Sequence, residues 1–226
     1  MPIDLTRVKG LCFDVDGTIS DTDDAWVERI VKWFAPRHRL NNTRRARVFA
    51  RRLVMVTESP MNFAYNLTDA LSLDDNFARL FERLARKRTG GPAHFILMDG
   101  ARELLEAAVK HYPLSVVSAR DARTTAEFLH QFSIREHFGE VVTNLTCEHT
   151  KPYPQPVQHA AAAMQLSPDT CLMIGDTPVD ILAGKRAGAQ TVGLLCGFGT
   201  EGELRRAGAD IILNDLRELH KLLIPE

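Results

Sequence analysis

The chain has 226 residues, a formal net charge of −1, and 45% hydrophobic and 25% charged residues. This length suits one α/β domain, or a core with a smaller inserted domain. No apolar run approaches the roughly 18 residues that a membrane-spanning helix needs, and the first residues lack the basic-then-apolar pattern of a signal peptide. We therefore expect no membrane partner and a cytoplasmic location.

The four cysteines form no CxxC pair. Three of them lie in or beside strand-like runs, which favours buried free thiols in a reducing cytosol over disulfides or a zinc site. The cysteines are Cys12, Cys147, Cys171 and Cys196.

The first predicted element is a short buried strand formed by Val8 and the apolar residues 11–13. Two carboxylates, Asp14 and Asp16, follow it directly. In an open α/β sheet, ligands bind outside the carboxyl ends of the strands. Two carboxylates so close together repel each other there, so they favour a divalent cation such as Mg²⁺, which takes oxygen ligands.

The next segment, residues 24–88, has helical patterns and almost no strand patterns. Gly90-Gly91-Pro92 then breaks the chain and is the best candidate for a domain boundary. We predict an inserted helical cap over residues 19–92. The catalytic core would then consist of residues 1–18 and 93–226.

The predicted cap is also basic, because residues 19–95 carry a net charge of +5 and the remainder carries −6. A basic cap would suit an anionic substrate, although surface charges also scatter unevenly by chance. The basic side chains in and between the first two predicted cap helices would either form a solvated face or grip an anionic part of the substrate. They are Arg29, Lys32, Arg37, Arg39, Arg44, Arg45, Arg47, Arg51 and Arg52.

From residue 93 onward, strand and helix patterns alternate. The predicted strands cover 114–118, 140–143, 170–174, 190–195 and 210–213. The predicted helices cover 100–111, 122–132, 156–164, 179–187, a segment from 201, and 216–223. Such alternation is typical of βαβ units. The predicted fold class is therefore α/β, with a Rossmann-like parallel sheet, helices on both faces and a helical insertion above its carboxyl edge.

Four polar clusters follow these strands in order. They are Asp14-Val15-Asp16-Gly17-Thr18, then Ser118, then Lys151-Pro152, and then the segment from Gly175 to Asp180. This set resembles the haloacid dehalogenase (HAD) superfamily, and in particular its helical-capped phosphatases, the group that includes phosphoglycolate phosphatases. The resemblance covers the whole chain, and the first and fourth clusters together make it specific.

The resemblance implies a Mg²⁺-dependent phosphatase that forms an aspartyl-phosphate. Asp14 would be the nucleophile. Asp16 would protonate the leaving oxygen and then activate water, and its backbone carbonyl would bind the metal. The presence of Asp16 argues against a dehalogenase, which has no leaving alkoxide to protonate. Thr18 would be the family's orienting hydroxyl at the phosphate site.

The other clusters would bind the phosphate and the metal. Ser118 would donate to a phosphoryl oxygen, helped by the N–H groups of Ala119 and Arg120 at the start of the next helix. The Arg120 side chain is a further candidate for a substrate contact. Lys151 would stabilise the charge on the transferring group. Asp176 would bind Mg²⁺ directly, and Asp180, one helical turn later, would do so directly or through another ligand.

Structural roles compete with some of these assignments. Ser118 and Asp176 each precede a predicted helix and could merely cap it. The segment Gly197-Phe198-Gly199 is predicted to be a plain turn after a strand. No recognised nucleic-acid motif appears, and the overall charge is not basic, so nucleic acid is not expected as a partner.

Two other functions stay open at this point. A phosphomutase of sugar phosphates would need a shielded aspartyl-phosphate and a second phosphate grip in the cap. A non-catalytic phosphate-binding module would keep the fold without needing the nucleophile. The expected partner is a small phosphorylated substrate whose identity the sequence does not specify, and the pattern indicates no particular oligomeric state.

Overall fold

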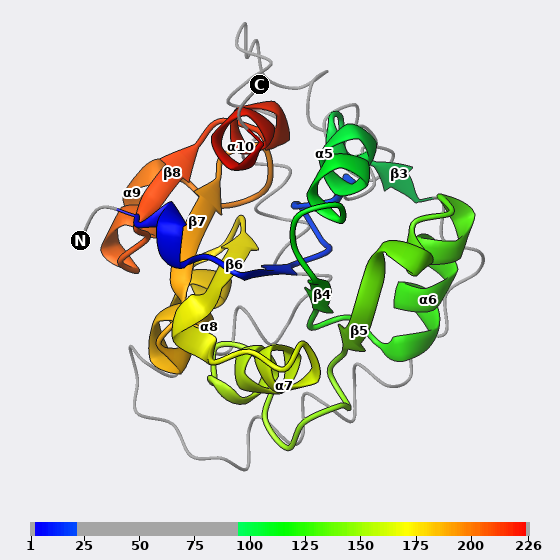
Figure 1. Ribbon diagram of the computed structural model, residues 1–226, viewed down its shortest axis with the longest axis horizontal. Helices are drawn as coiled ribbons and strands as arrows, with labels where there is room; N and C mark the ends of the chain where they lie inside the picture. The colour runs from blue at the N-terminus through cyan, green and yellow to red at the C-terminus, as the bar shows by residue number, and fades with distance from the viewer. Residues whose placement is uncertain (1–2, 22–94, 225–226) are drawn as a thin grey trace, which may run out of the picture. The chain divides into compact units, whose positions relative to one another are not determined.

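The structure is a computed structural model that describes residues 3–21 and 95–224 (Figure 1). These residues belong to one of the two compact units into which the chain divides, Met1–Thr22 together with Phe95–Glu226. The other unit, Asp23–His94, lies outside the described residues. The predicted cap helices, their basic side chains and the Gly90-Gly91-Pro92 boundary therefore also lie outside them.

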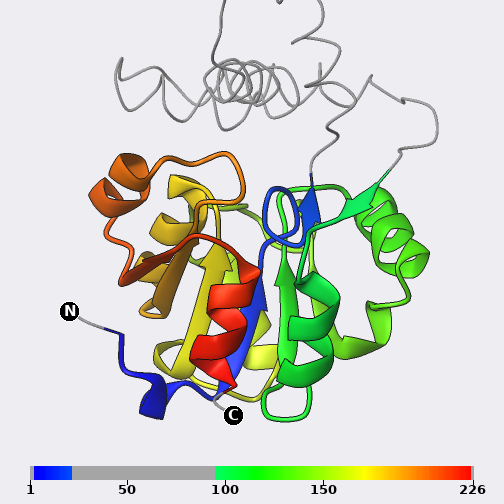
Figure 2. The same cartoon turned by 90° about the horizontal axis from the view of Figure 1, so that it is seen from above.

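Six parallel strands form a single sheet in the order β5-β4-β1-β6-β7-β8 (Figure 2). The strands are β1 (Gly10–Phe13), β4 (Leu114–Val117), β5 (Phe138–Val142), β6 (Cys171–Gly175), β7 (Gln190–Leu194) and β8 (Ile211–Leu213). The predicted parallel α/β sheet is confirmed. The first strand lies inside the sheet, between β4 and β6, so its carboxyl end opens where the strand order reverses.

Six α-helices accompany the sheet in the described residues. They are α5 (Ala101–Ala108), α6 (Ala122–Gln131), α7 (Gln155–Ala163), α8 (Pro178–Ala187), α9 (Glu201–Arg206) and α10 (Leu216–Leu223). As predicted, Gly188 ends α8, in the left-handed conformation that favours glycine. No helix of this part of the chain combines the length and the apolar character needed to cross a membrane.

The side chains of the central strand alternate between two cores. Leu11 and Phe13 pack in a cluster with residues of α5 and α10, including Leu105 and Leu219. Cys12 belongs to a second cluster with residues of α7 and α8. The two helix pairs lie on opposite faces of the sheet (Figure 1). This period of two is what a strand buried on both faces requires, and it fixes the register of β1 in the sheet.

Two further strands were not predicted from the sequence. They are β2 (Ser20–Asp21) and β3 (Ile96–Leu97), which pair antiparallel. The amide of Met98 also donates to the carbonyl of Ile19 at 2.9 Å. Two residues are too few to show an alternating pattern, so only the paired structure reveals these strands. The pairing ties the two chain ends that flank residues 22–94 to each other.

Candidate active site

The site begins where β1 and β6 end side by side. Phe13 is paired with Ile174, and the amide of Asp14 donates to the carbonyl of Ile174 at 2.9 Å. Asp176 follows directly after Gly175, the last residue of β6. Because the two strands are parallel, both aspartates emerge at the same edge of the sheet. One oxygen from each of three buried carboxylates, Asp14, Asp176 and Asp180, lies within 4.8 Å of the others.

The first turn of α8 holds Asp180 in this cluster. Thr177 is the N-cap, and its amide and hydroxyl donate to Asp180 Oδ2 at 3.1 Å and 2.6 Å. This is a capping box, and Pro178 occupies the first turn of the helix. A Cβ at Gly175 would clash with the Asp180 side chain, which explains the glycine. Thr177, and not Asp176, therefore caps the helix, so the capping alternative for Asp176 is wrong.

Lys151 joins two of the three carboxylates. Its Nζ donates to Asp14 Oδ1 at 2.6 Å and to Asp180 Oδ1 at 2.5 Å. The lysine side chain is only 3% exposed, so both ion pairs are shielded from water. The loop between β5 and α7 carries it there, as the order of the sequence motifs required.

The cluster holds more negative charge than Lys151 balances. Burial and the neighbouring charge of Asp180 raise the pKa of Asp14 from 3.8 to about 7, although Lys151 lowers it. Burial, together with the charges of Asp180 and Asp14, also raises the pKa of Asp176. Burial opposes a charged lysine, but Asp14 and Asp180 outweigh it and raise the pKa of Lys151.

These shifts have a common physical cause. Three ionised carboxylates and one ammonium leave an excess of two negative charges in a buried space. Carboxylate oxygens are the ligands that Mg²⁺ prefers, so the residues present fit a divalent cation. The ion would balance the charge that otherwise keeps these pKa values high.

The family model of haloacid dehalogenase-like hydrolases matches residues 11–194 of the chain. The chain belongs to this family. The prediction of an enzyme of this family, made from the four motifs, is confirmed.

This HAD-like chain is similar to one relative over nearly its whole length and to another over half of it. Pyrophosphatase PpaX of Anoxybacillus flavithermus is 26% identical over 222 residues, which cover 96% of this chain and 97% of that protein. Phosphoglycolate phosphatase of Neisseria meningitidis is 31% identical over 117 residues, half of each chain.

Solved structures are similar over nearly the whole chain. A hydrolase from Pseudomonas syringae is 26% identical with a TM-score of 0.62, covering 95% of this chain and 99% of its own. A haloacid dehalogenase-like family hydrolase from Streptococcus pneumoniae, at 21% identity and a TM-score of 0.67, covers 95% and 97% and shows the fold alone.

In this HAD-like hydrolase, the loop after β7 has a role that the sequence did not reveal. The amide of Phe198 donates to Asp176 Oδ2 at 2.6 Å, and the amide of Gly199 donates to the Asp176 carbonyl at 3.1 Å. A Cβ at Gly197 would clash with the Asp176 carboxylate and with the Gly17 carbonyl. The segment is a loop after a strand, as predicted, but its packing against Asp176 was not predicted. Two glycines flanking one aromatic residue after a strand were the available signal.

Thr18 also contacts Asp176 in this HAD-like site. Its buried hydroxyl donates to Asp176 Oδ1 at 3.2 Å, so both oxygens of that carboxylate accept a hydrogen bond. Thr18 thus orients a candidate metal ligand, and its expected phosphate contact stays a prediction. The second oxygen of Asp14 has no such hydrogen bond among the described residues.

The segment after β4 differs from the expectation. The helix α6 begins at Ala122 and is capped by Asp121, whose side chain accepts from Thr124. The amide of Arg120 donates to Ser118 Oγ at 3.1 Å. Ala119 and Arg120 therefore precede the helix and are not part of its first turn, and Ser118 is not its cap. A contact of their N–H groups with phosphate stays a prediction.

Asp16 lies apart from the three clustered carboxylates. Its carboxylate is paired with the Arg120 guanidinium, where Nε donates to Oδ2 at 3.2 Å and Nη2 donates to Oδ1. The sequence indicated Arg120 as a contact for phosphate or substrate, and gave no sign of its pairing with Asp16. The two residues are 104 positions apart, so no local pattern indicated that they meet.

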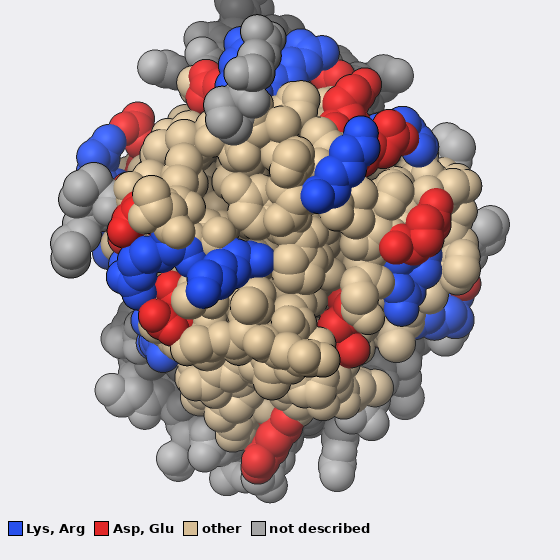
Figure 3. All heavy atoms as spheres, viewed as in Figure 1, with Lys and Arg blue, Asp and Glu red and all other residues tan. Residues whose placement is uncertain are grey.

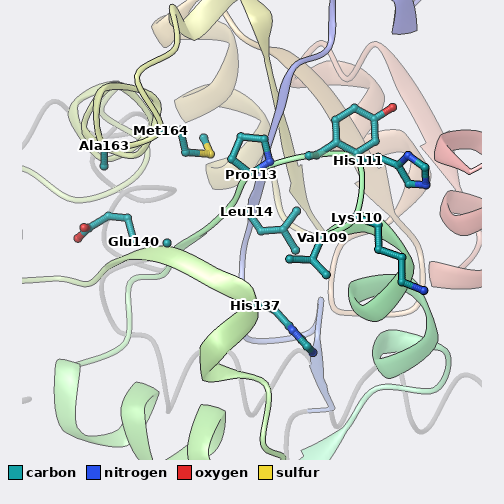
Figure 4. Close-up of a pocket in the computed structure, with 11 residues that line it drawn as sticks. Val109, Lys110, His111, Pro113, Leu114, His137, Glu140, Ala163 and Met164 are labelled. Atoms are coloured by element: carbon teal, nitrogen blue, oxygen red, sulfur yellow. The ribbon is translucent and has the colours of Figure 1, made fainter.

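A separate pocket of about 570 Å³ lies at the amino-terminal edge of the sheet, opposite the carboxyl edge that holds the candidate site (Figure 4). It is lined by residues around the starts of β4 and β5, among them Lys110, His111, His137 and Glu140.

On the face shown in Figure 3, blue basic and red acidic side chains are interspersed around uncharged residues. Neither feature carries the clustered charge of the carboxyl edge, which remains the candidate site.

Proposed function

We propose that this chain is a Mg²⁺-dependent phosphomonoester hydrolase that acts on a small phosphorylated metabolite through an aspartyl-phosphate on Asp14. The observation that carries the proposal is the buried cluster of Asp14, Asp176 and Asp180 with Lys151. The names of the relatives, a pyrophosphatase and a phosphoglycolate phosphatase, favour phosphoryl chemistry over carbon–halogen cleavage.

Asp14 is the proposed nucleophile. Its carboxylate attacks phosphorus while the bond to the leaving oxygen breaks, and Asp16 gives that oxygen a proton. Asp16, now ionised, takes a proton from water. This water attacks the phosphorus of the aspartyl-phosphate and releases phosphate and the free Asp14 carboxylate. Two displacements thus replace one difficult step.

Lys151 has two tasks in this scheme. It favours the ionised, nucleophilic form of Asp14, because an adjacent ammonium stabilises a buried carboxylate. It also offers positive charge to the phosphoryl oxygens during transfer. Its contact with Asp180, which is itself held by Thr177, keeps the ammonium in place.

Asp14 and Asp176 are the proposed direct ligands of Mg²⁺, with the backbone carbonyl of Asp16. Asp180 accepts three hydrogen bonds, one of them from Lys151, which favours a role in orienting that lysine. Asp176 accepts one hydrogen bond on each oxygen, so each keeps a lone pair for the ion. When bound, the ion would balance the carboxylates and draw negative charge from the phosphoryl oxygens.

Substrate contacts are proposed for two groups after β4. The Ser118 oxygen accepts from the Arg120 amide, which leaves the hydroxyl proton to donate to a phosphoryl oxygen. Arg120 Nη1 is buried and has no hydrogen-bond partner among the described residues, so it offers a further donor. We also propose that the unit Asp23–His94 forms a helical cap that excludes water. The protein is proposed to work in the cytoplasm with its cysteines reduced.

Release of inorganic phosphate from a panel of metabolite phosphates, with Mg²⁺ present, tests the proposal. Asp14→Asn should abolish turnover, because an amide cannot form the aspartyl-phosphate. The matched control is Asp99→Asn, which changes an exposed carboxylate paired with Arg217 and should keep full activity. Turnover retained by Asp14→Asn would contradict the assignment of the nucleophile.

The same assay separates the two other functions. A phosphomutase would return an isomerised sugar phosphate instead of free phosphate. A binding module would release no phosphate from any ester, although it would bind phosphorylated compounds. The unbalanced buried carboxylates favour the hydrolase over the binding module, since a site for phosphate alone gains nothing from three negative charges.

A further inference from the structure

Arg120 holds the carboxylate of Asp16 through both of its oxygens. Nε donates to Oδ2 at 3.2 Å, and Nη2 donates to Oδ1. The Asp16 side chain is 35% exposed, and Arg120 is its one hydrogen-bonding side chain among the described residues. We call these two hydrogen bonds the Arg120 fork. Without the fork, the partly exposed carboxylate would be free to rotate among its staggered conformations.

Two aromatic rings hold the guanidinium itself. Its Cζ lies 5.0 Å from the centroid of the Phe95 ring and 5.9 Å from that of the Phe128 ring. The two rings contact each other edge to face at 5.7 Å, and the arginine side chain is 15% exposed. Cation–π attraction and partial burial therefore keep the fork in place before any substrate binds.

We propose that Arg120 is a positioning residue that sets the direction in which Asp16 delivers its proton. The inference rests on the proposed function, in which Asp16 protonates the leaving oxygen. A general acid acts only from within hydrogen-bonding distance of that oxygen, and an error of about 1 Å in placement can cost about 10²-fold in rate. Two hydrogen bonds from Arg120 fix the direction of the Asp16 side chain, and the carboxyl oxygen that carries the proton exchanges its bond to the guanidinium for one to the leaving oxygen.

The consequence is a dependence on the leaving group. Phenyl phosphate has a poor leaving group that needs the proton, whereas dinitrophenyl phosphate has a good one that departs without it. Arg120→Ala should lower kcat/KM about 10²-fold for phenyl phosphate and less than about 10-fold for dinitrophenyl phosphate, whose smaller loss reports only the proposed substrate contact of Nη1. Arg120→Lys keeps the charge but loses the fork, so it should lie between the wild type and Arg120→Ala.

Two further measurements separate positioning from a structural role. Phe95→Leu retains Arg120 and most of the packing volume but removes a ring face. Its kcat/KM should therefore fall more for phenyl phosphate than for dinitrophenyl phosphate, as in Arg120→Ala, but by a smaller factor. Guanidinium ion added to Arg120→Ala should restore part of the rate on phenyl phosphate. The control is Arg123→Ala, an exposed arginine of α6 that pairs with Glu127 and should change neither rate.

Equal losses on the two esters, or a faster Arg120→Ala enzyme, would overturn the inference while leaving the proposed function intact. A wild type that releases phosphate from neither ester would overturn the proposed function and the inference with it. Thermal denaturation followed by circular dichroism shows whether Arg120→Ala is folded. If it is not, the ratio of rates for Phe95→Leu decides the question.

Discussion

In the protein without bound metal, Asp14→Asn is expected to raise the free energy of unfolding at about pH 8. The pKa of Asp14 is about 7 in the folded protein against an ordinary value of 3.8, because burial and the charge of Asp180 outweigh the attraction of Lys151. The folded state thus holds a proton that the unfolded state releases. Its contribution to stability is complete below about pH 4 and is lost as the pH rises through about 7.

The size of the expected stabilisation follows from the difference between the pKa of Asp14 in the folded protein and its ordinary value. At about 1.4 kcal/mol per pKa unit, ionised Asp14 costs the folded state on the order of 4 kcal/mol above pH 7. Asparagine resembles the protonated carboxyl group in shape and charge. Imperfect hydrogen bonding of the amide to Lys151 offsets part of the gain, so we expect a net stabilisation of about 1–3 kcal/mol.

Urea unfolding in the presence of a chelator, at about pH 8 and pH 5, measures the effect. The difference between the variant and the wild type should shrink at the lower pH, where the wild type already binds the proton. Added Mg²⁺ should stabilise the wild type more than the variant, because the ion relieves the same repulsion. A variant no more stable than the wild type at the higher pH would refute the argument.

Two other substitutions test the surroundings of the site. Gly197→Ala should push the loop after β7 away from Asp176 and weaken Mg²⁺ affinity about 10-fold or more, measured by Mg²⁺ titration of activity. Gly202→Ala is its control, since a Cβ there meets no atom within 4 Å, and undiminished affinity in Gly197→Ala would be the contrary result. Asp210→Ala should cost about 1–3 kcal/mol in urea unfolding, because Asp210 Oδ2 accepts from the amide and hydroxyl of Thr191 at 2.9 Å and 2.8 Å. Burial raises the pKa of Asp210, but hydrogen bonds from Lys185 of α8 and from Thr191 outweigh it and lower the pKa below its ordinary value. The cost of Asp210→Ala should therefore fade as the pH drops below about 4. A cost that does not change with pH would contradict that origin.

The parts of the fold that depend on neighbouring residues could be predicted. The helix Leu216–Leu223 has its predicted bounds, because its apolar face recurs at helical spacing and Asp215 caps it. The central strands β1 and β6 are continuous apolar runs, as expected of parallel strands buried on both faces. The short strands β2 and β3 were missed, because two residues carry no period.

What the sequence determined by itself was that Asp14 and Asp176 follow buried strands, since parallel strands deliver such residues to one edge. What only the tertiary structure decided was the partner of each polar atom. The amide of Phe198 bonds to Asp176, and Arg120 bonds to Asp16. These partners are far apart in the chain, and a hydrogen bond depends on distances of a few tenths of an ångström, which no local pattern specifies.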